Sequence, residues 1–182
     1  MSNEMLIRCC APTMAGLKTG NMFNCPFDSK EEMTAELRQL NRILGSKGLR
    51  ILPLRWSNGR ALVYLFRPKR LEQDLQNELA AQILSECGYT GNNPNSCVMQ
   101  LISRFRSEGD FPHEVGLFLG YPPADVGGFM HRKEDWKLSG IWKVYDDVAG
   151  AARQFERCHH CTEVYLRCAR KGFSIDRLTV KN

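Results

Sequence analysis

The sequence lacks the features by which several large classes of protein are recognised. No run approaches the roughly 20 consecutive apolar residues that a membrane-spanning helix needs. The N-terminus has no basic stretch followed by a long apolar one, so no secretory signal is predicted. No block of five or more like charges and no internal repeat occurs. We therefore expect a cytoplasmic protein that does not enter a membrane.

Familiar catalytic motifs are also missing. The chain contains no P-loop, no G-x-G-x-x-G after a strand, no H-E-x-x-H and no G-x-S-x-G. His113 and Glu114 are adjacent, but Val-Gly-Leu follows them, which is not the spacing of a zincin. The sequence thus assigns neither a reaction nor a cofactor, and it leaves open whether the protein is an enzyme.

The composition is that of an ordinary globular protein. Of its 182 residues, 43% are hydrophobic and 25% are charged, which argues against disorder. This length suits one well-buried core, so we expect a single domain over residues 1–182. The net charge of +5 comes from basic residues mixed with acids along the chain. Nucleic acid binding is therefore not indicated.

The eight cysteines fit reduced thiols in the cytoplasm rather than a disulfide framework. The CHHC stretch at 158–161 resembles a metal motif, but it falls inside a predicted helix. There Cys158 and Cys161 share one face, while His159 and His160 diverge by about 100°. Because one helix cannot present all four side chains to a tetrahedral zinc ion, no metal site is predicted.

Hydrophobic periodicity and turn signals predict the secondary structure. Strands are predicted at 5–10, 49–56, 61–66, 140–145 and 174–180. Helices are predicted at 29–48, 68–87, 96–107 and 146–172. Asn58-Gly59 between two apolar runs is the strongest short signal for a hairpin, and Pro53 suggests an edge strand or a bulge.

The order of these elements predicts an α+β or mixed α/β fold. We expect a small sheet of four to five strands with helices packed on it. Residues 11–20 read as part of a loop after the first strand. The order resembles the ferredoxin-like β-α-β-β-α-β pattern, with a helical insertion at about 90–135.

Residues 111–130 (FPHEVGLFLGYPPADVGGFM) combine three prolines, four glycines and an adjacent His-Glu pair. Prolines suit helix starts, so the segment predicts two short helices joined at Gly-Tyr-Pro, with His113 and Glu114 in the first turn. A helix N-terminus keeps imidazole neutral, so His113 could act as a base. The alternative is that both residues are surface caps on a well-packed corner.

Three stretches resemble an uncharacterised bacterial family, catalogued as a domain of unknown function and found largely in anaerobic Firmicutes. They are CAPTMAGLKTGNMF near the start, HEVGLFLGYPPADVGGF in the middle and GIWKVY after it. The motifs are CAPT-x-AG-x-K and HE-[IV]-G-x-FLGYP. The resemblance covers nearly the whole chain and implies no known activity, cofactor or fold.

The glycine-rich stretches suggest a pocket between loop 11–20 and segment 111–130. We expect it to bind a small anionic molecule or cofactor, because backbone N–H groups and Lys18 favour negative charge. The candidate ligand-binding residues are Thr13, Lys18, Gly120 and Tyr121.

Two alternatives remain. One is a thiol-dependent enzyme with Cys10 as nucleophile, His113 as base and Glu114 beside it; Arg8 or Lys18 would lower the pKa of Cys10. The other is a protein-interaction module that uses the basic outer face of the helix over 147–171. That face carries Arg153, Arg157, His160, Arg167 and Lys171, although such a stripe is more often the solvated side of an amphipathic helix.

Overall fold

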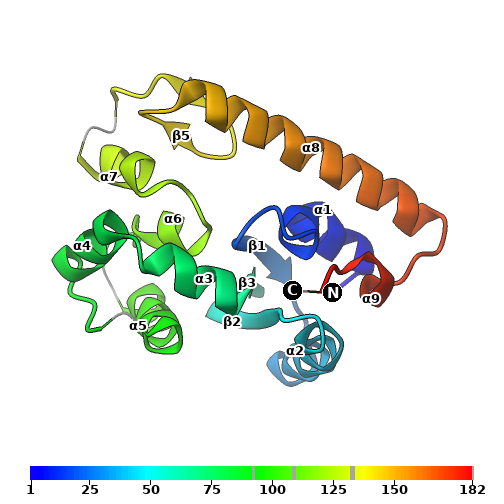
Figure 1. Ribbon diagram of the computed structural model, residues 1–182. Coiled ribbons are helices and arrows are strands. Elements are labelled where there is room, and N and C mark those ends of the chain that lie inside the picture. The colour runs from blue at the N-terminus through cyan, green and yellow to red at the C-terminus, as the bar shows by residue number, and fades with distance from the viewer. Residues whose placement is uncertain (92, 108–109, 132–133, 182) are drawn as a thin grey trace.

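A three-stranded antiparallel sheet separates two groups of helices in the computed structural model, which describes residues 1–91, 93–107, 110–131 and 134–181 (Figure 1). A second, two-stranded sheet lies beside the start of the longest helix. In chain order the elements are α1 (Asn3–Met14), β1 (Gly20–Pro26), α2 (Lys30–Gly45), β2 (Arg50–Ser57), β3 (Arg60–Phe66), α3 (Pro68–Leu75), α4 (Glu78–Glu86), α5 (Pro94–Arg106), α6 (Val115–Phe118), α7 (Pro123–His131), β4 (Leu138–Ser139), β5 (Lys143–Val144), α8 (Val148–Arg170) and α9 (Ile175–Leu178).

The predicted hairpin is confirmed. Strands β2 and β3 pair antiparallel around Asn58 and Gly59, which have φ values of 45° and 70°. Two positive φ values are what a type I′ turn requires, and they match the right-handed twist of the strands. Pro53 lies on the edge strand β2, where the register shifts between Pro53 and Arg55. Both predictions for this proline are therefore correct.

The α+β class is confirmed, but the larger sheet is smaller than predicted. Its order is β1-β3-β2, three strands rather than four to five. The complete ferredoxin-like pattern is not present in the described residues, because the segment predicted as its first strand belongs to helix α1 and the one predicted as its last strand, 140–145, contributes only β5 to the separate two-stranded sheet. Helices α2 and α3 also pack on opposite faces of the sheet: Leu37 belongs to one core cluster and Leu71 to the other.

The central strand β3 contributes to both clusters. Val63 and Leu65 face the cluster formed with α1 and α2, whereas Tyr64 and Phe66 face the cluster formed with α3 to α7. This alternation is the two-residue periodicity of a strand that is buried on both faces.

The prediction of a strand at 5–10 is wrong, because these residues belong to α1. The Ser2 hydroxyl accepts a hydrogen bond from the Met5 N–H and caps the helix. The buried side chains recur with helical spacing: Leu6, Ile7, Cys10, Ala11 and Met14. The same residues also fit a short strand, and packing against α8 decides in favour of the helix.

Four further elements differ from the prediction. Residues 20–26, expected in a loop, form strand β1 along β3. The helix predicted at 68–87 is two helices, because the Asn77 side chain accepts hydrogen bonds from two backbone N–H groups and starts α4. The Ser174 hydroxyl likewise caps α9, where a strand was expected. The strand predicted at 140–145 is reduced to β5.

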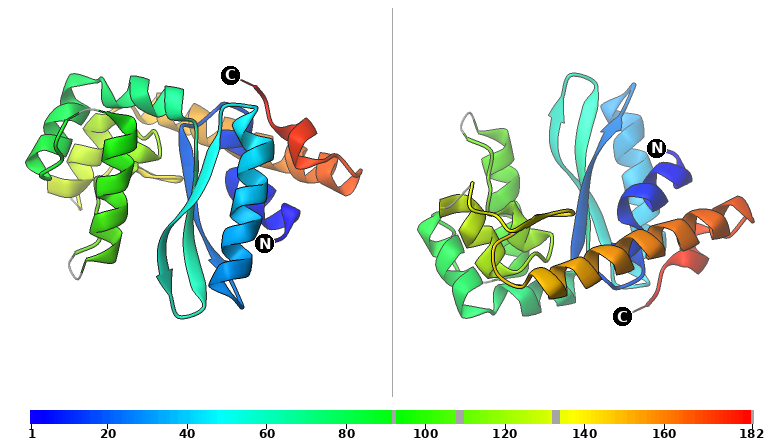
Figure 2. Two further views of the ribbon diagram at one scale, coloured as in Figure 1. Left: turned by 90° about the horizontal axis from the view of Figure 1, so that it is seen from below. Right: turned by 90° about the horizontal axis from the view of Figure 1, so that it is seen from above.

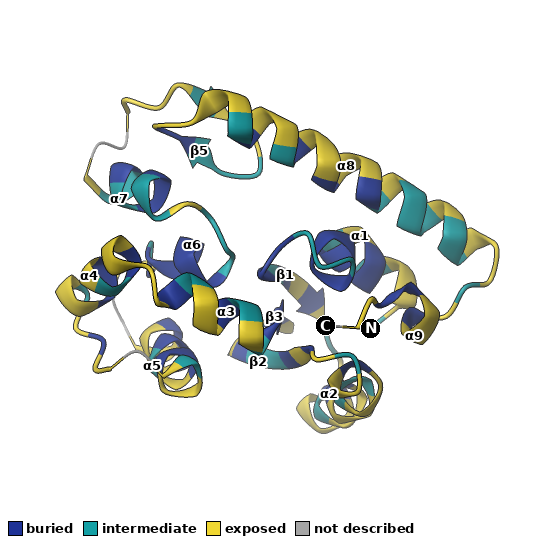
Figure 3. Ribbon diagram, in the orientation of Figure 1, coloured by how far each residue is buried: buried dark blue, intermediate teal, exposed yellow. Residues whose placement is uncertain are grey.

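Helix α8 crosses the molecule from the small sheet to α1 and α9, as the two views of Figure 2 show. Asp147 rather than Asp146 caps it, since its carboxylate accepts the Gly150 N–H at 2.8 Å. One side of α8 is buried and the other is exposed (Figure 3). None of the helices in the described ranges is long and apolar enough to cross a bilayer.

Helices α5, α6 and α7 occupy the region that was predicted as a helical insertion. Residues 92, 108–109 and 132–133 of that region lie outside the described residues. As predicted, residues 111–130 hold two short helices joined at Gly-Tyr-Pro. They bring Tyr121 toward α1 and the loop that follows it, where the candidate site lies.

Candidate functional site

The loop after α1 begins with a tight glycine turn. Gly16 has a φ of +76°, the Leu17 N–H bonds to the Pro12 carbonyl and the Gly16 N–H bonds to the Thr13 carbonyl. This pair of hydrogen bonds is the Schellman arrangement that ends many helices. It reverses the chain and places Lys18 directly beyond the end of α1.

Side chains from distant elements hold this loop. The Arg67 guanidinium, only 1% exposed, donates to the Thr13, Met14 and Val180 carbonyls, each at 2.8 Å. The Arg70 guanidinium donates to the Gly16 carbonyl, and the Gln154 amide donates to the Leu17 carbonyl at 2.9 Å. These contacts fix the backbone on the N-terminal side of Lys18.

A second glycine turn faces the first. Gly120, with φ +73°, ends α6 in the same arrangement, because the Tyr121 N–H bonds to the Gly116 carbonyl. A Cβ atom at Gly120 would lie 2.5 Å from the Thr19 hydroxyl oxygen. Only glycine permits this approach of the two backbones.

Lys18 is the most unusual charged side chain of this junction. It is only 4% exposed, and its ammonium lies 4.7 Å from the centroid of the Tyr121 ring. Among the described residues, no oxygen accepts a hydrogen bond from this ammonium. Burial lowers the pKa of Lys18 from 10.5 to about 8, while the nearby thiols of Cys158 and Cys10 act in the opposite direction.

Lys18 lines a pocket of about 360 Å³, which we call the lysine pocket. Its walls come from the loop after α1, the turn before α7, the small sheet and the start of α8. They include Leu17, Lys18, Arg70, Gly120, Pro122 and Gln154. Both stretches that the sequence singled out thus contribute to one pocket.

Tyr121 and Thr13, which were also predicted to bind a ligand, do not line the lysine pocket. Tyr121 lines a neighbouring pocket, described below, and its hydroxyl donates to the Ile141 carbonyl at 3.2 Å. Burial raises the pKa of Tyr121 to about 12. Thr13 is fully buried, and its hydroxyl donates to the Asn21 side-chain oxygen at 2.6 Å. The Thr13 hydroxyl is thus engaged by a partner within the protein.

Glu114 is buried, not a surface cap. Its carboxylate lies 2.6 Å from the Arg104 guanidinium and accepts the Tyr89 hydroxyl at 2.9 Å. Only 2% of the Glu114 side chain is exposed, so its carboxylate contacts these internal partners rather than solvent. His113 and Glu114 also precede α6 rather than lying inside its first turn.

The structure does not bring Cys10 and His113 into contact within the described residues. Cys10 is fully buried in α1, whereas His113 lines the neighbouring pocket with Phe129. Burial raises the pKa of the Cys10 thiol well above its usual value, and the Lys18 charge offsets this only in part. That is the opposite of the shift a nucleophilic thiolate needs.

The CHHC stretch lies within α8, with its cysteines on the buried side of the helix and its histidines on the exposed side. Cys158 and Cys161 are buried, and His159 and His160 are exposed. No group of three or more potential metal ligands occurs in the described ranges. The basic side chains of α8 are all exposed, namely Arg153, Arg157, His160, Arg167 and Lys171.

Sequence reasoning missed several residues that line the lysine pocket. Arg70 and Gln154 lie on amphipathic helices with no local pattern that distinguishes them. Asp125 and Trp142 do fall within the quoted family stretches, where each was noted only as part of a helix or a strand. Asp125 is 3% exposed, and its carboxylate accepts the Trp142 indole N–H at 2.7 Å.

The fold and the site define a mixed α+β protein with a buried lysine beside a preformed pocket. The chain belongs to the family described as "Protein of unknown function (DUF3793)", whose model matches residues 6–179. The predicted membership of a domain-of-unknown-function family is thereby confirmed. No curated protein and no solved structure shows a significant match.

Proposed function

We propose that the protein binds a small molecule with one negatively charged group in the lysine pocket. The observation that carries this proposal is Lys18, a residue only 4% exposed that lines the pocket and whose ammonium has no hydrogen-bond acceptor among the described residues. Burying a charge without an ionic or hydrogen-bonding partner is costly, and a bound anion would supply that partner. Arg70, whose guanidinium is half-buried at the same pocket, adds a second positive charge.

The carboxylates of the pocket favour a singly charged ligand. Asp125 already accepts N–H groups from Trp142, Tyr145 and Asp146. Asp147 is used as the cap of α8. Their negative charges, together with the exposed Asp146, would repel a polyphosphate more strongly than a single carboxylate. A small carboxylic acid is therefore the favoured ligand class.

Thermal denaturation with acetate tests this proposal. At equal ionic strength, acetate should raise the Tm of the wild-type protein above its value in chloride, since a ligand of the folded state stabilises it. The increment should vanish in Lys18→Met and persist in Lys171→Met, which removes an exposed lysine at the far end of α8. Equal increments in wild type and Lys18→Met would overturn the proposal.

Native mass spectrometry of the purified protein provides a second test. A co-purifying small acid should be retained by the wild type and the Lys171→Met control and lost from Lys18→Met. A bound acid retained equally by Lys18→Met would place it elsewhere and contradict the proposal.

A further inference from the structure

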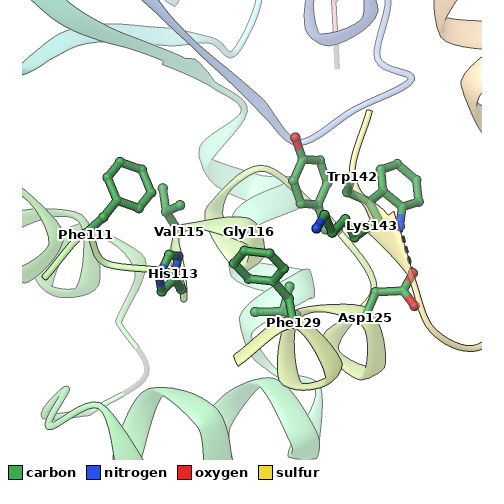
Figure 4. Close-up of a pocket in the computed structure, with 10 residues that line it drawn as sticks. Phe111, His113, Val115, Gly116, Asp125, Phe129, Trp142 and Lys143 are labelled. Atoms are coloured by element: carbon green, nitrogen blue, oxygen red, sulfur yellow. Dashed lines mark hydrogen bonds between the residues drawn. The ribbon is translucent and has the colours of Figure 1, made fainter. Parts of the chain in front are cut away.

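A second pocket, of about 310 Å³, shares Asp125 and Trp142 with the lysine pocket. We call it the aromatic pocket, because its walls include five rings: Phe111, His113, Tyr121, Phe129 and Trp142. Figure 4 shows Phe111, His113, Phe129 and Trp142 in the wall of this pocket, together with Lys143. They come from the segment before α6, the turn before α7, α7 itself and the strand β5 region.

Hydrogen bonds and ring contacts fix the side chains that form the walls of the aromatic pocket. The indole N–H of Trp142 donates to Asp125, and the Trp142 and Phe155 rings meet edge to face with their centroids 4.5 Å apart. Tyr121 stacks on Trp142 at 4.9 Å and bonds to a backbone carbonyl. The His113 and Phe129 rings meet edge to face at 5.0 Å. A ring that entered would meet fixed surfaces and would not have to order them first.

The charged residues of the aromatic pocket favour ligands of one charge over the other. The Lys143 ammonium lies 5.8 Å from the centroid of Phe129 and 5.2 Å from that of Trp136. This resident cation would repel a cationic ligand. Asp125 is the acidic residue of the lining, and its carboxylate is occupied by three N–H donors. No described residue forms a hydrogen bond with the His113 ring nitrogens, which leaves them for a ligand.

We infer that the aromatic pocket binds a flat aromatic or heteroaromatic ring that carries an acidic substituent. The ring would pack between Phe129 and Trp142, and the acidic group would lie at Lys143. A volume near the lower end of ligand pockets, which span about 300–1,000 Å³, suits one or two fused rings. This inference goes beyond the proposed function, since it requires no binding at Lys18.

Naphthalene-2-carboxylate is a suitable probe, compared with naphthalene-2-methanol and 2-naphthylmethylammonium, which carry the same ring. Calorimetry should give the order carboxylate, alcohol, ammonium from tightest to weakest. In protein labelled with ¹⁵N-tryptophan, the carboxylate should shift the indole signal of Trp142 and leave that of Trp56 unchanged. An unmoved Trp142 signal, or a preference for the ammonium, would overturn the inference.

Two substitutions separate the contribution of ring packing to the binding affinity from the contribution of charge. Phe129→Leu should weaken all three probes about tenfold, and Lys143→Met should remove the preference for the carboxylate. Phe173→Leu, which alters a half-buried ring beside α9, is the matched control and should change neither. Unchanged affinity in Phe129→Leu would contradict the inference.

The outcomes also separate this inference from the proposed function. Lys18→Met should bind naphthalene-2-carboxylate as the wild type does, and Phe129→Leu should keep the Tm increment in acetate. Loss of the naphthalene probe in Lys18→Met alone would show that the ring enters the lysine pocket. That result would refute the aromatic pocket while leaving the proposal at Lys18 intact.

Discussion

The ammonium of Lys18 and the ring of Tyr121 lie 4.7 Å apart, where two glycine-ended helices from distant parts of the chain meet. Lys18 lines one pocket and Tyr121 lines the next. The two proposed binding sites therefore meet at this contact, with Asp125 and Trp142 shared between their linings. Both sites depend on the same fixed approach of the two turns.

Replacing Lys18 by methionine should stabilise the protein at pH 7. The lowered pKa, about 8 in place of 10.5, means that the folded state carries the charge at a cost of about 3 kcal/mol. The lost contact with Tyr121 offsets part of that gain, by about 0.5–2 kcal/mol. Urea denaturation of wild type and Lys18→Met would measure the difference.

The same difference should depend on pH in a definite direction. Between about pH 8 and 10.5 the folded wild type releases a proton that its unfolded state retains, so the wild type gains stability relative to Lys18→Met as pH rises. The advantage of the variant should be complete below pH 8 and disappear by about 10.5. A Lys18→Met protein less stable than wild type at pH 7 would identify a structural lysine and weaken the case for a ligand.

Gly120→Ala should destabilise the protein by about 3 kcal/mol. The substitution combines a strained positive φ with a Cβ atom pressed against Thr19, whose hydroxyl is held by Asp74. Gly172→Ala is the matched control, because Gly172 has a φ of +84° and nothing within 4 Å of the added atom. It should cost only about 1 kcal/mol. Equal losses in denaturation experiments would mean that the two turns can separate freely.

The sequence predicted elements well where local chemistry determines them. The Asn58-Gly59 hairpin and the helix capped by Ser29 depend on side chains within a few residues of each other. In α1, by contrast, Leu6 and Ile7 fit a strand as well as a helix, and contacts with α8, far along the chain, decide the outcome. Tertiary packing of this kind overrides local pattern.

In the candidate site, too, features set by local residues could be predicted, whereas those set by long-range contacts could not. Gly16 and Gly120 stand out in the sequence, since turns demand particular residues there. The pairing of Glu114 with Arg104 does not, because the partner lies on α5 and no local spacing signals it. Burial places Cys10 in the core and lowers the pKa of Lys18. It is likewise a property of the folded chain and not of the local sequence.

Glu114→Gln should destabilise the protein by about 1–2 kcal/mol, because the buried side chain exchanges charge-assisted contacts with Arg104 and Tyr89 for weaker neutral ones, while Arg104 is 42% exposed and stays hydrated. Glu4→Gln is the control, since Glu4 pairs with Arg8 on the surface with about 60% of each side chain exposed. That exposed pair should contribute less than about 1 kcal/mol. A Glu114→Gln protein as stable in urea denaturation as the Glu4→Gln control would contradict this account of the pair.

Thiol labelling tests the alternative in which Cys10 is a catalytic nucleophile. With iodoacetamide at pH 7, the half-buried Cys9, Cys87 and Cys168 should react first. Cys10 should react only as fast as the protein opens, because it is fully buried and its thiol pKa is raised.

Peptide mass spectrometry over a time course would rank the eight cysteines, and labelling in urea would show that each peptide is detectable. In urea Cys10 should lose its protection, because the fold that buries it is gone. A Cys10 that reacts ahead of the half-buried thiols in native buffer would restore the nucleophile hypothesis. It would also require the end of α1 to open beside Lys18, in conflict with the carbonyl contacts through which Arg67 holds that end closed.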